Sequence, residues 1–219
     1  MTDLRSLVLL GAGGHAKVLL SLMVSLGREI IGVCDPDLVK RGTSKWRGIP
    51  VLGDDSALES IDCCAVDAVN GIGCLPGSVA RRALYLHTVG RGFRFATLVH
   101  PSAYVDSTAI LGPGTQVMAG AVVQADAALG ENCIVNTGAI IDHDCLVGDH
   151  VHIAPGVTLA GGVSIGSGAF IGAGATVIQG VEIGSGAIIG AGTVVLKRVD
   201  ANQVFVGRRS DGGAVLERS

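Results

Sequence analysis

Three histidines lie within ten residues of one another in the second half of the chain, at positions 143, 150 and 152. His143 stands between Asp142 and Asp144. A carboxylate bound to one ring nitrogen of a histidine fixes the tautomer and raises the basicity of the other nitrogen. Such a histidine can remove a proton from an attacking amine or hydroxyl near neutral pH. We therefore expect His143 to act as a general base.

Other roles for these histidines are less well supported. Three solvated surface histidines would be the simplest interpretation, and we favour it for His150. Zinc needs a tetrahedral set of ligands, and no such spacing of His, Cys and carboxylate residues is apparent. The six cysteines show no CxxC or CxxH spacing and are expected to be small buried hydrophobic residues, with Cys145 pointing inward. We expect no metal.

The elements that position His143 follow a repeat of six residues. Every first position of the repeat from Val99 to Val195 is Val, Leu or Ile, and every fifth position is Ala, Thr, Cys or Val. Hexapeptide periodicity is typical of a parallel β-helix, in which short strands and turns wind round a prism. Three hexads make one triangular coil, so residues 18 apart stack at about 4.8 Å. The Gly-rich pairs supply the corner turns.

The first ninety-five residues have a different pattern. A short apolar strand at 7–10 is followed by the turn GAGGHA and an apolar helix at 16–26, and a second strand at 30–34 ends at Asp35. This order matches a βαβ unit whose glycine turn brings backbone N–H groups against phosphate oxygens. A strand at 66–72, a helix at 78–89 and a strand at 93–99 should complete a small parallel sheet.

Two other interpretations of the glycine turn remain open. A dinucleotide cofactor would be the first choice from the motif alone, but this half is short for a complete dinucleotide-binding fold and no hydride-transfer residues follow it. The glycines could also form a tight turn that binds no ligand.

Composition and charge exclude several classes of partner. The formal net charge of −3 gives no reason to expect nucleic acid or an anionic membrane. The apolar stretch near the N-terminus is interrupted by Gly11, Gly13, Gly14, His15 and Lys17, so it is expected neither to span a membrane nor to be a signal peptide. We expect a soluble cytoplasmic protein.

Together, the GAGGH turn and the long run of hexads resemble the bacterial sugar O- and N-acyltransferases. The resemblance spans essentially the whole chain and implies a left-handed β-helix, although crossover connections are usually right-handed. It implies an α/β nucleotide-sugar-binding domain, with a small parallel Rossmann-like sheet, at 1–97, a left-handed parallel β-helix at 98–200 and a C-terminal tail at 201–219. The implied activity is acetyl-CoA-dependent N-acetylation of a nucleotide-linked amino sugar by a homotrimer.

The resemblance also assigns roles to individual residues. His143 is implied as the base and Asp144 as its orienting partner. Contacts to the nucleotide sugar are implied for Gly13, Gly14, His15, Asp35, Gly73 and, from an adjoining chain, Asn136. A contact to acetyl-CoA is implied for His152. The coil register, rather than the resemblance, predicts that Gly161, one coil after His143, leaves that edge open for the pantetheine arm and that Ala173 and Ala191, 18 residues apart, continue the groove. A basic group of Lys197, Arg198, Arg208 and Arg209 could meet the CoA phosphates or be solvated. The family usually has Pro after the position of Gly207, and this chain has Arg.

Among possible substrates, we favour a GDP-linked 4-amino-4,6-dideoxy sugar such as perosamine over a UDP-linked 4-amino sugar. Products of this kind serve surface polysaccharides, glycoprotein glycans or O-antigen. One alternative is a sugar O-acetyltransferase of the sialic acid type, which would use the same base on a hydroxyl. Another is a non-catalytic binding or scaffold protein with a degenerate site.

Overall fold

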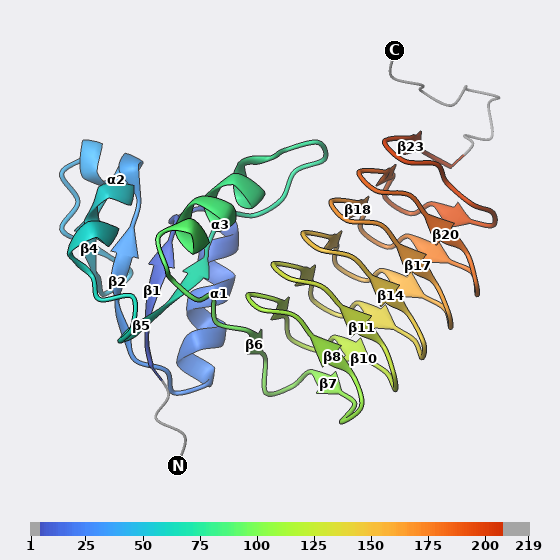
Figure 1. Cartoon of the computed structure of the whole chain (residues 1–219), viewed down its shortest axis with the longest axis horizontal. Helices are drawn as coiled ribbons and strands as arrows, with labels where there is room; N and C mark the ends of the chain where they lie inside the picture. The colour runs from blue at the N-terminus through green and yellow to red at the C-terminus, as the bar shows by residue number, and fades with distance from the viewer. Residues whose placement is uncertain (1–4, 208–219) are drawn as a thin grey trace. The chain divides into compact units, whose positions relative to one another are not determined.

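The computed structural model describes residues 5–207, which form two compact units. Within the described residues, the first unit takes in the chain as far as Cys74 and the segment Ser78–Leu98, and the second takes in Leu75–Gly77 and the chain from Val99 onward. Figure 1 shows the helices in the first unit and the stacked coils in the second.

The first unit is a five-stranded sheet with helices. Its strand order is β3-β4-β2-β1-β5, and every neighbouring pair is parallel except β3 and β4, which form a hairpin. Its strands are β1 (Ser6–Leu10), β2 (Ile30–Cys34), β3 (Lys45–Trp46), β4 (Ile49–Gly53) and β5 (Val66–Asn70). Its helices are α1 (Gly14–Ser25), α2 (Pro36–Lys40), α3 (Ala80–Gly90) and the 3₁₀ helix η1 (Asp55–Ser60).

Most of the elements expected in this unit are present, with two differences. The strand expected at 93–99 is broken into an isolated bridge between Ala68 and Phe95 and the short strand β6 (Leu98–Val99). No element was predicted in the segment between β2 and β5, and it contains α2, the β3–β4 hairpin and η1.

The second unit is a parallel β-helix with three faces, each a ladder of two-residue strands. The first face consists of β7 (Tyr104–Val105), β10 (Val122–Val123), β13 (Ile140–Ile141), β16 (Thr158–Leu159), β19 (Thr176–Val177) and β22 (Val194–Val195). The second consists of β8 (Ile110–Leu111), β11 (Ala128–Leu129), β14 (Leu146–Val147), β17 (Ser164–Ile165) and β20 (Glu182–Ile183). The third consists of β6, β9 (Gln116–Val117), β12 (Ile134–Val135), β15 (His152–Ile153), β18 (Phe170–Ile171), β21 (Ile188–Ile189) and β23 (Val204–Phe205).

The hexad determines which side chains fill the prism. First-position residues such as Val123, Ile141 and Leu159 are fully buried and form one continuous apolar core with the small residues of the fifth positions. From Gly114 to Gly192 every fourth-position residue has positive φ, which glycine adopts without strain. Where glycine is absent, Asp126, Asn132, Asp144 and His150 take this conformation instead.

The repeat departs from six residues in the last coil. Val177 pairs with Val195 at the usual spacing of 18, but Ile183 bridges to Val199, which is only 16 residues further on. Two residues are therefore missing from the corner at 196–198. If the repeat continued unbroken, Val199 would be a fifth-position residue. This expectation is wrong, because Val199 occupies a first position.

Within residues 5–207 no helix is both long and apolar enough to cross a membrane.

Candidate active site

The glycine turn forms the entrance to helix α1. Gly13 is the N-cap residue of α1 and, as a glycine, makes no side-chain cap hydrogen bond to the first turn of the helix. A Cβ built on Gly13 or Gly14 would meet nothing within 4 Å. An exposed helix N-terminus with open space above it favours an anionic group such as a phosphate.

The carboxylate of Asp35 joins this turn to the next helix. Its Oδ2 accepts a hydrogen bond from the N–H of Ala12 at 2.8 Å, and its Oδ1 accepts one from Leu38 at 2.9 Å, capping α2. The side chain therefore holds the glycine turn against the end of β2. Each oxygen still has a lone pair for another donor, such as a ribose hydroxyl.

A cavity of about 590 Å³ opens beside the turn. Its lining includes Gly13, Asp35 and Gly73, three of the residues expected to bind the nucleotide sugar. Gly14 and His15 do not line it. A Cβ on Gly73 would come within 3.2 Å of the His15 Cβ, so Gly73 lets the end of β5 approach α1 closely. The cavity also extends along α3 to His87, a wall that the sequence did not suggest.

His143 lies at the corner between the first and second faces, between β13 and β14. Its Nδ1 is 2.7 Å from Oδ2 of Asp144, and both side chains are more than half exposed. Asp144 reaches the ring because its φ of 58° bends the chain back at this corner. Asp142 has a different role, because its Oδ1 accepts a hydrogen bond from the backbone N–H of His143 at 2.8 Å.

The two carboxylates raise the pKa of His143 above its ordinary value. The hydrogen bond to Asp144 is the larger cause, and the negative charge of Asp142 adds to it. Because Asp144 accepts from Nδ1, the opposite nitrogen, Nε2, is the one left to accept a proton from a substrate. The pair therefore has the geometry of a general base and its orienting carboxylate.

Gly161 lies one coil after His143 at the same corner. A Cβ at this position would come within 2.6 Å of both Cε1 and Nε2 of the imidazole. The ring can adopt this position because residue 161 has no side chain. The backbone continues the contact, since Gly162 donates its N–H to the carbonyl of His143 at 2.9 Å.

The other residues expected at the site lie elsewhere on the prism. Asn136, Ala173 and Ala191 occupy the corner between the third and first faces. His152 is on β15 of the third face, where its ring is buried and stacks on Phe170 with centroids 4.9 Å apart. One chain therefore places the expected acetyl-CoA contacts on two corners, with Gly161 and the base at one and the two alanines at the other.

His150 is not a solvated surface residue. Its Nδ1 is 3.1 Å from Nδ2 of Asn132, one coil earlier, and its Nε2 is 3.7 Å from a carboxylate oxygen of Glu131. Only 9% of its side chain is exposed. The expectation was wrong because it ignored the residues stacked 18 positions away, which pack on a corner side chain.

The basic group near the C-terminus is only partly described. Arg198 is exposed and lies within ion-pair distance of Glu182 and Asp200, at 3.1 and 3.4 Å. Lys197 lies at the same corner as His143, three coils further on. Arg208 and Arg209 lie outside the described residues, as does most of the tail expected at 201–219.

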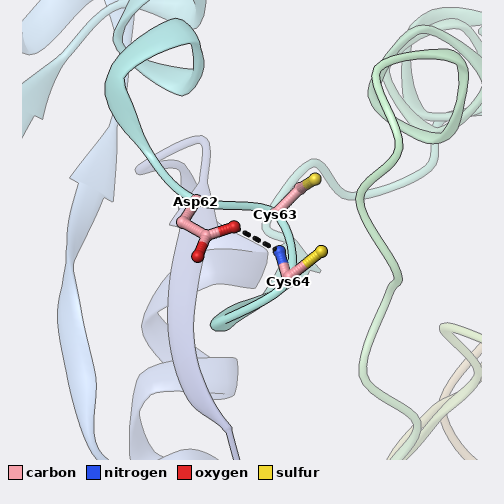
Figure 2. A group of neighbouring side chains, drawn as sticks. All are labelled: Asp62, Cys63 and Cys64. Carbon is pink, nitrogen blue, oxygen red and sulfur yellow. Dashed lines mark hydrogen bonds between the residues drawn. The ribbon is translucent and has the colours of Figure 1, made fainter.

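The cysteines are not all buried as expected. Cys34, Cys133 and Cys145 are buried, but Cys63 and Cys74 are partly exposed and Cys64 is exposed. In residues 5–207, Asp62, Cys63 and Cys64 are the group whose ligand atoms lie within 4.8 Å of one another. Figure 2 shows both sulfurs on one side of the turn and the carboxylate on the other, where it accepts the Cys64 N–H at 2.8 Å. Three residues give one ligand fewer than the four of a structural zinc site, and none of them lines the cavity.

Comparison with known proteins supports both halves of the chain. Residues 6–82 match the PglD N-terminal domain, and residues 126–161 and 162–197 match the bacterial transferase hexapeptide family of six repeats. The search of curated proteins gave no match.

Several solved structures are similar over nearly the full length. The acetyltransferase domain of PglB from Neisseria gonorrhoeae FA1090 is 37% identical, with 93% of this chain and 97% of that chain covered and a TM-score of 0.85. PerB from Caulobacter crescentus, solved with CoA and GDP-perosamine, is also 37% identical, with 94% and 95% covered and a TM-score of 0.84. WeeI from Acinetobacter baumannii AYE, at 24% identity, 92% and 96% coverage and a TM-score of 0.80, shares the fold. The expected fold, an α/β domain followed by a left-handed parallel β-helix, is confirmed.

Proposed function

Because the chain belongs to the bacterial hexapeptide-repeat acyltransferases with a PglD-type N-terminal domain, we propose that it acetylates the amine of a nucleotide-linked amino sugar with acetyl-CoA. One observation carries the chemistry of the proposal. The imidazole of His143 is bound through Nδ1 to Asp144 on an exposed corner, while Nε2 is left to accept a proton.

The proposed reaction is a direct transfer. The amine nitrogen attacks the thioester carbonyl, a C–N bond forms, the C–S bond breaks and CoA leaves as the thiolate. The proton lost by nitrogen moves to Nε2 of His143 and from there to the departing sulfur. Asp144 keeps the imidazole in the tautomer with hydrogen on Nδ1 and stabilises the imidazolium that forms. No acyl-enzyme is needed once both substrates are held in place.

The nucleotide is assigned to the cavity of the first unit. The N-terminal N–H groups of α1 and the turn at Gly13, Gly14 and His15 suit a diphosphate. Asp35 and Gly73 line the cavity on either side of the turn. This assignment is favoured over a dinucleotide cofactor because the relative solved with CoA holds GDP-perosamine.

Acetyl-CoA is assigned to the β-helix. Gly161, Ala173 and Ala191 offer backbone without bulky side chains, and His152 lies on the third face near Ala173 in the coil order. Lys197, three coils beyond His143, is about 14 Å away at the inter-strand spacing, a distance that an extended pantetheine arm can span. The phosphates of CoA would then approach the basic group.

A homotrimer is part of the proposal, and the places of the assigned residues support an active site shared between copies. Adjacent corners of one coil are separated by a hexad, roughly 15–20 Å of extended chain, so one chain cannot place its base at Ala173 and Ala191. Packing prisms side by side brings the His143 corner of one copy to the other corner of the next. Exposed apolar side chains on the outer faces, such as Ile140, Leu146 and Ile110, are suitable for such packing. In this arrangement Asn136 is contributed by the adjoining chain.

We propose a GDP-linked 4-amino-4,6-dideoxy sugar such as perosamine as the substrate, and a cytoplasmic reaction, since acetyl-CoA is a cytoplasmic metabolite. The test is a panel of GDP- and UDP-linked amino sugars, assayed for CoA release and for the acetylated product by mass spectrometry. An amine-bearing sugar should be turned over while its hydroxyl counterpart is not. Turnover of the hydroxyl compound alone would instead favour O-acetylation, and turnover of none would favour a scaffold.

A further inference from the structure

The cavity of the first unit has a second polar region away from the glycine turn. We infer that this region selects the base of the nucleotide, that the base is guanine, and that the carboxylate of Asp55 recognises it. The inference rests on the proposed function, because it assumes that a nucleotide sugar occupies this cavity. Asp55 is the first residue of η1 and lines the cavity together with one face of α3.

The cavity continues as a crevice between η1 and α3. Leu58 of η1 and Tyr85 of α3 belong to the same apolar cluster, so the two helices cover the same side of the sheet. Ala80, Ala83 and His87 line the crevice at intervals of three and four residues, which places them on one face of α3. From Ala80 to His87 this face extends about 10 Å along the helix axis. With the phosphates at the glycine turn, the crevice is long enough for a ribose and a base.

The walls of the crevice suit a flat ring. Leu84 of α3 and Pro36 of α2 line it with apolar surface, and the two alanines of α3 add only small side chains. The floor is Cys34, which is fully buried. Burial raises the pKa of the Cys34 thiol to about 11, and the charges of Asp55 and Asp54 contribute to the shift. The thiol therefore stays neutral, and the negative charge of Asp55 lies near the floor on which a base would rest.

Two carboxylates line the cavity within the described residues, and only that of Asp55 is not already hydrogen-bonded within the protein. Asp35 already accepts the N–H groups of Ala12 and Leu38. The side chain of Asp55 makes no hydrogen bond or ion pair within residues 5–207, whereas its neighbour Asp54 caps η1 through Ser56. Asp55 is therefore the carboxylate left to bind the base.

A carboxylate accepts hydrogen bonds and donates none, and this decides among the bases. Guanine presents two adjacent donors, N1–H and the 2-amino group, which match the two carboxylate oxygens. Uracil presents one N–H between two carbonyl oxygens, and these would lie against the negative charge. Adenine and cytosine place an acceptor beside their amino group. A carboxylate at this position therefore favours guanine and disfavours uracil.

The test is isothermal titration of the full chain with GDP, UDP and IDP, the last of which lacks the 2-amino group. Wild type should bind GDP at least about tenfold more tightly than either UDP or IDP, because a site that accepts hydrogen bonds from two ligand donors discriminates by that factor or more against a base that lacks or misplaces one of them. In Asp55→Asn both ratios should fall to within about threefold. Glu59→Gln is the matched control, since Glu59 lies on the same helix, outside the cavity, and pairs with Arg91. It should keep the wild-type ratios, and thermal unfolding should show both variants folded.

Two outcomes would overturn the inference and leave the proposed function in place. One is a wild-type protein that binds UDP as tightly as GDP, and the other is an Asp55→Asn variant that keeps both wild-type ratios. A third outcome overturns the proposed function as well, namely that no nucleoside diphosphate binds at millimolar concentration to a protein that binds CoA.

Discussion

The imidazole of His143 lies against the backbone of Gly161, so close that a Cβ at residue 161 would come within 2.6 Å of Nε2. The glycine at this position determines where the ring sits, and Asp144 determines its tautomer. The two constraints come from different coils, 18 residues apart, and act on the same side chain.

Gly161→Ala should therefore displace the base without unfolding the prism. Residue 161 has no positive φ, so the backbone accepts alanine, but the ring must move. We expect kcat to fall about 10- to 100-fold. The check is a double-mutant cycle: in the His143→Asn background the same substitution should cost little more, because no ring remains to be displaced. Equal losses in both backgrounds would mean that Gly161 acts on acetyl-CoA alone.

The pH dependence of the rate should follow the ionisation of His143. Its pKa is raised, and only the unprotonated ring accepts a proton, so kcat/KM should rise with pH through that pKa and then level off. Asp144→Asn removes the main cause of the shift, so the rising limb should move to lower pH while the plateau falls. His143→Asn should remove the limb and lower kcat by about 10²- to 10⁴-fold with CoA affinity unchanged. A His143→Asn enzyme with near-normal turnover would contradict the proposed base.

Much of the fold can be predicted from the sequence because the residue types within each hexad indicate which side chains point inward and where the chain turns. An aliphatic first position, a small fifth position and glycine at the fourth specify the interior and the corner wherever they occur. The shortened last coil could not be predicted this way, because VLKRVD satisfies the hexad pattern even though the structure closes the corner after four residues. Pairing between coils, rather than the pattern within one, fixes the register there.

Other features were missed although the sequence held a signal for them. Helix α2 begins with Asp35 as N-cap and Pro36 at the first helical position, a common start of a helix. The packed position of His150 follows from Asn132, 18 residues earlier. The wall that α3 contributes to the cavity could not be deduced from the sequence. It depends on how the helix packs on the sheet, and neither a motif nor a residue spacing indicates that packing.

Inward and outward residues of one strand should respond differently to a charge. Ile165 is 2% exposed inside the prism, whereas its neighbour Ser164 points outward. Ile165→Asp places an unpaired carboxylate in an apolar interior and should lower the free energy of unfolding by about 3–5 kcal/mol. Ser164→Asp should change it by less than about 1 kcal/mol. Chemical denaturation followed by circular dichroism measures both, and similar losses would contradict the assigned orientation.

The glycine turn should control nucleotide binding and leave CoA binding unchanged. Gly13 has an extended backbone and open space around its Cβ position, so Gly13→Val should fold normally. The branched side chain would occupy the space in which a phosphate approaches the N–H groups, and affinity for the nucleotide sugar should fall at least about tenfold. Gly90→Val, also in open space but outside the cavity, is the control. Titration with nucleotide and with CoA separates the two effects, and tight NAD binding at this turn would overturn the assignment.

Mixing two inactive variants should restore activity if each active site is shared between copies. His143→Asn removes the base from one corner, and Ala173→Trp blocks the other corner, where the alanine is exposed and a large side chain does not disturb the core. Each variant alone should be inactive. After the two are unfolded and refolded together in equal amounts, about one quarter of the sites combine an intact His143 with an intact Ala173 from the neighbouring copy, so activity should recover to about that fraction of wild type. The control is refolding each variant alone, which should recover none. A mixture that forms trimers but stays inactive would contradict this prediction. It would mean that the active site is not shared between copies, and that the acetyl-CoA contacts assigned to the two corners are wrong.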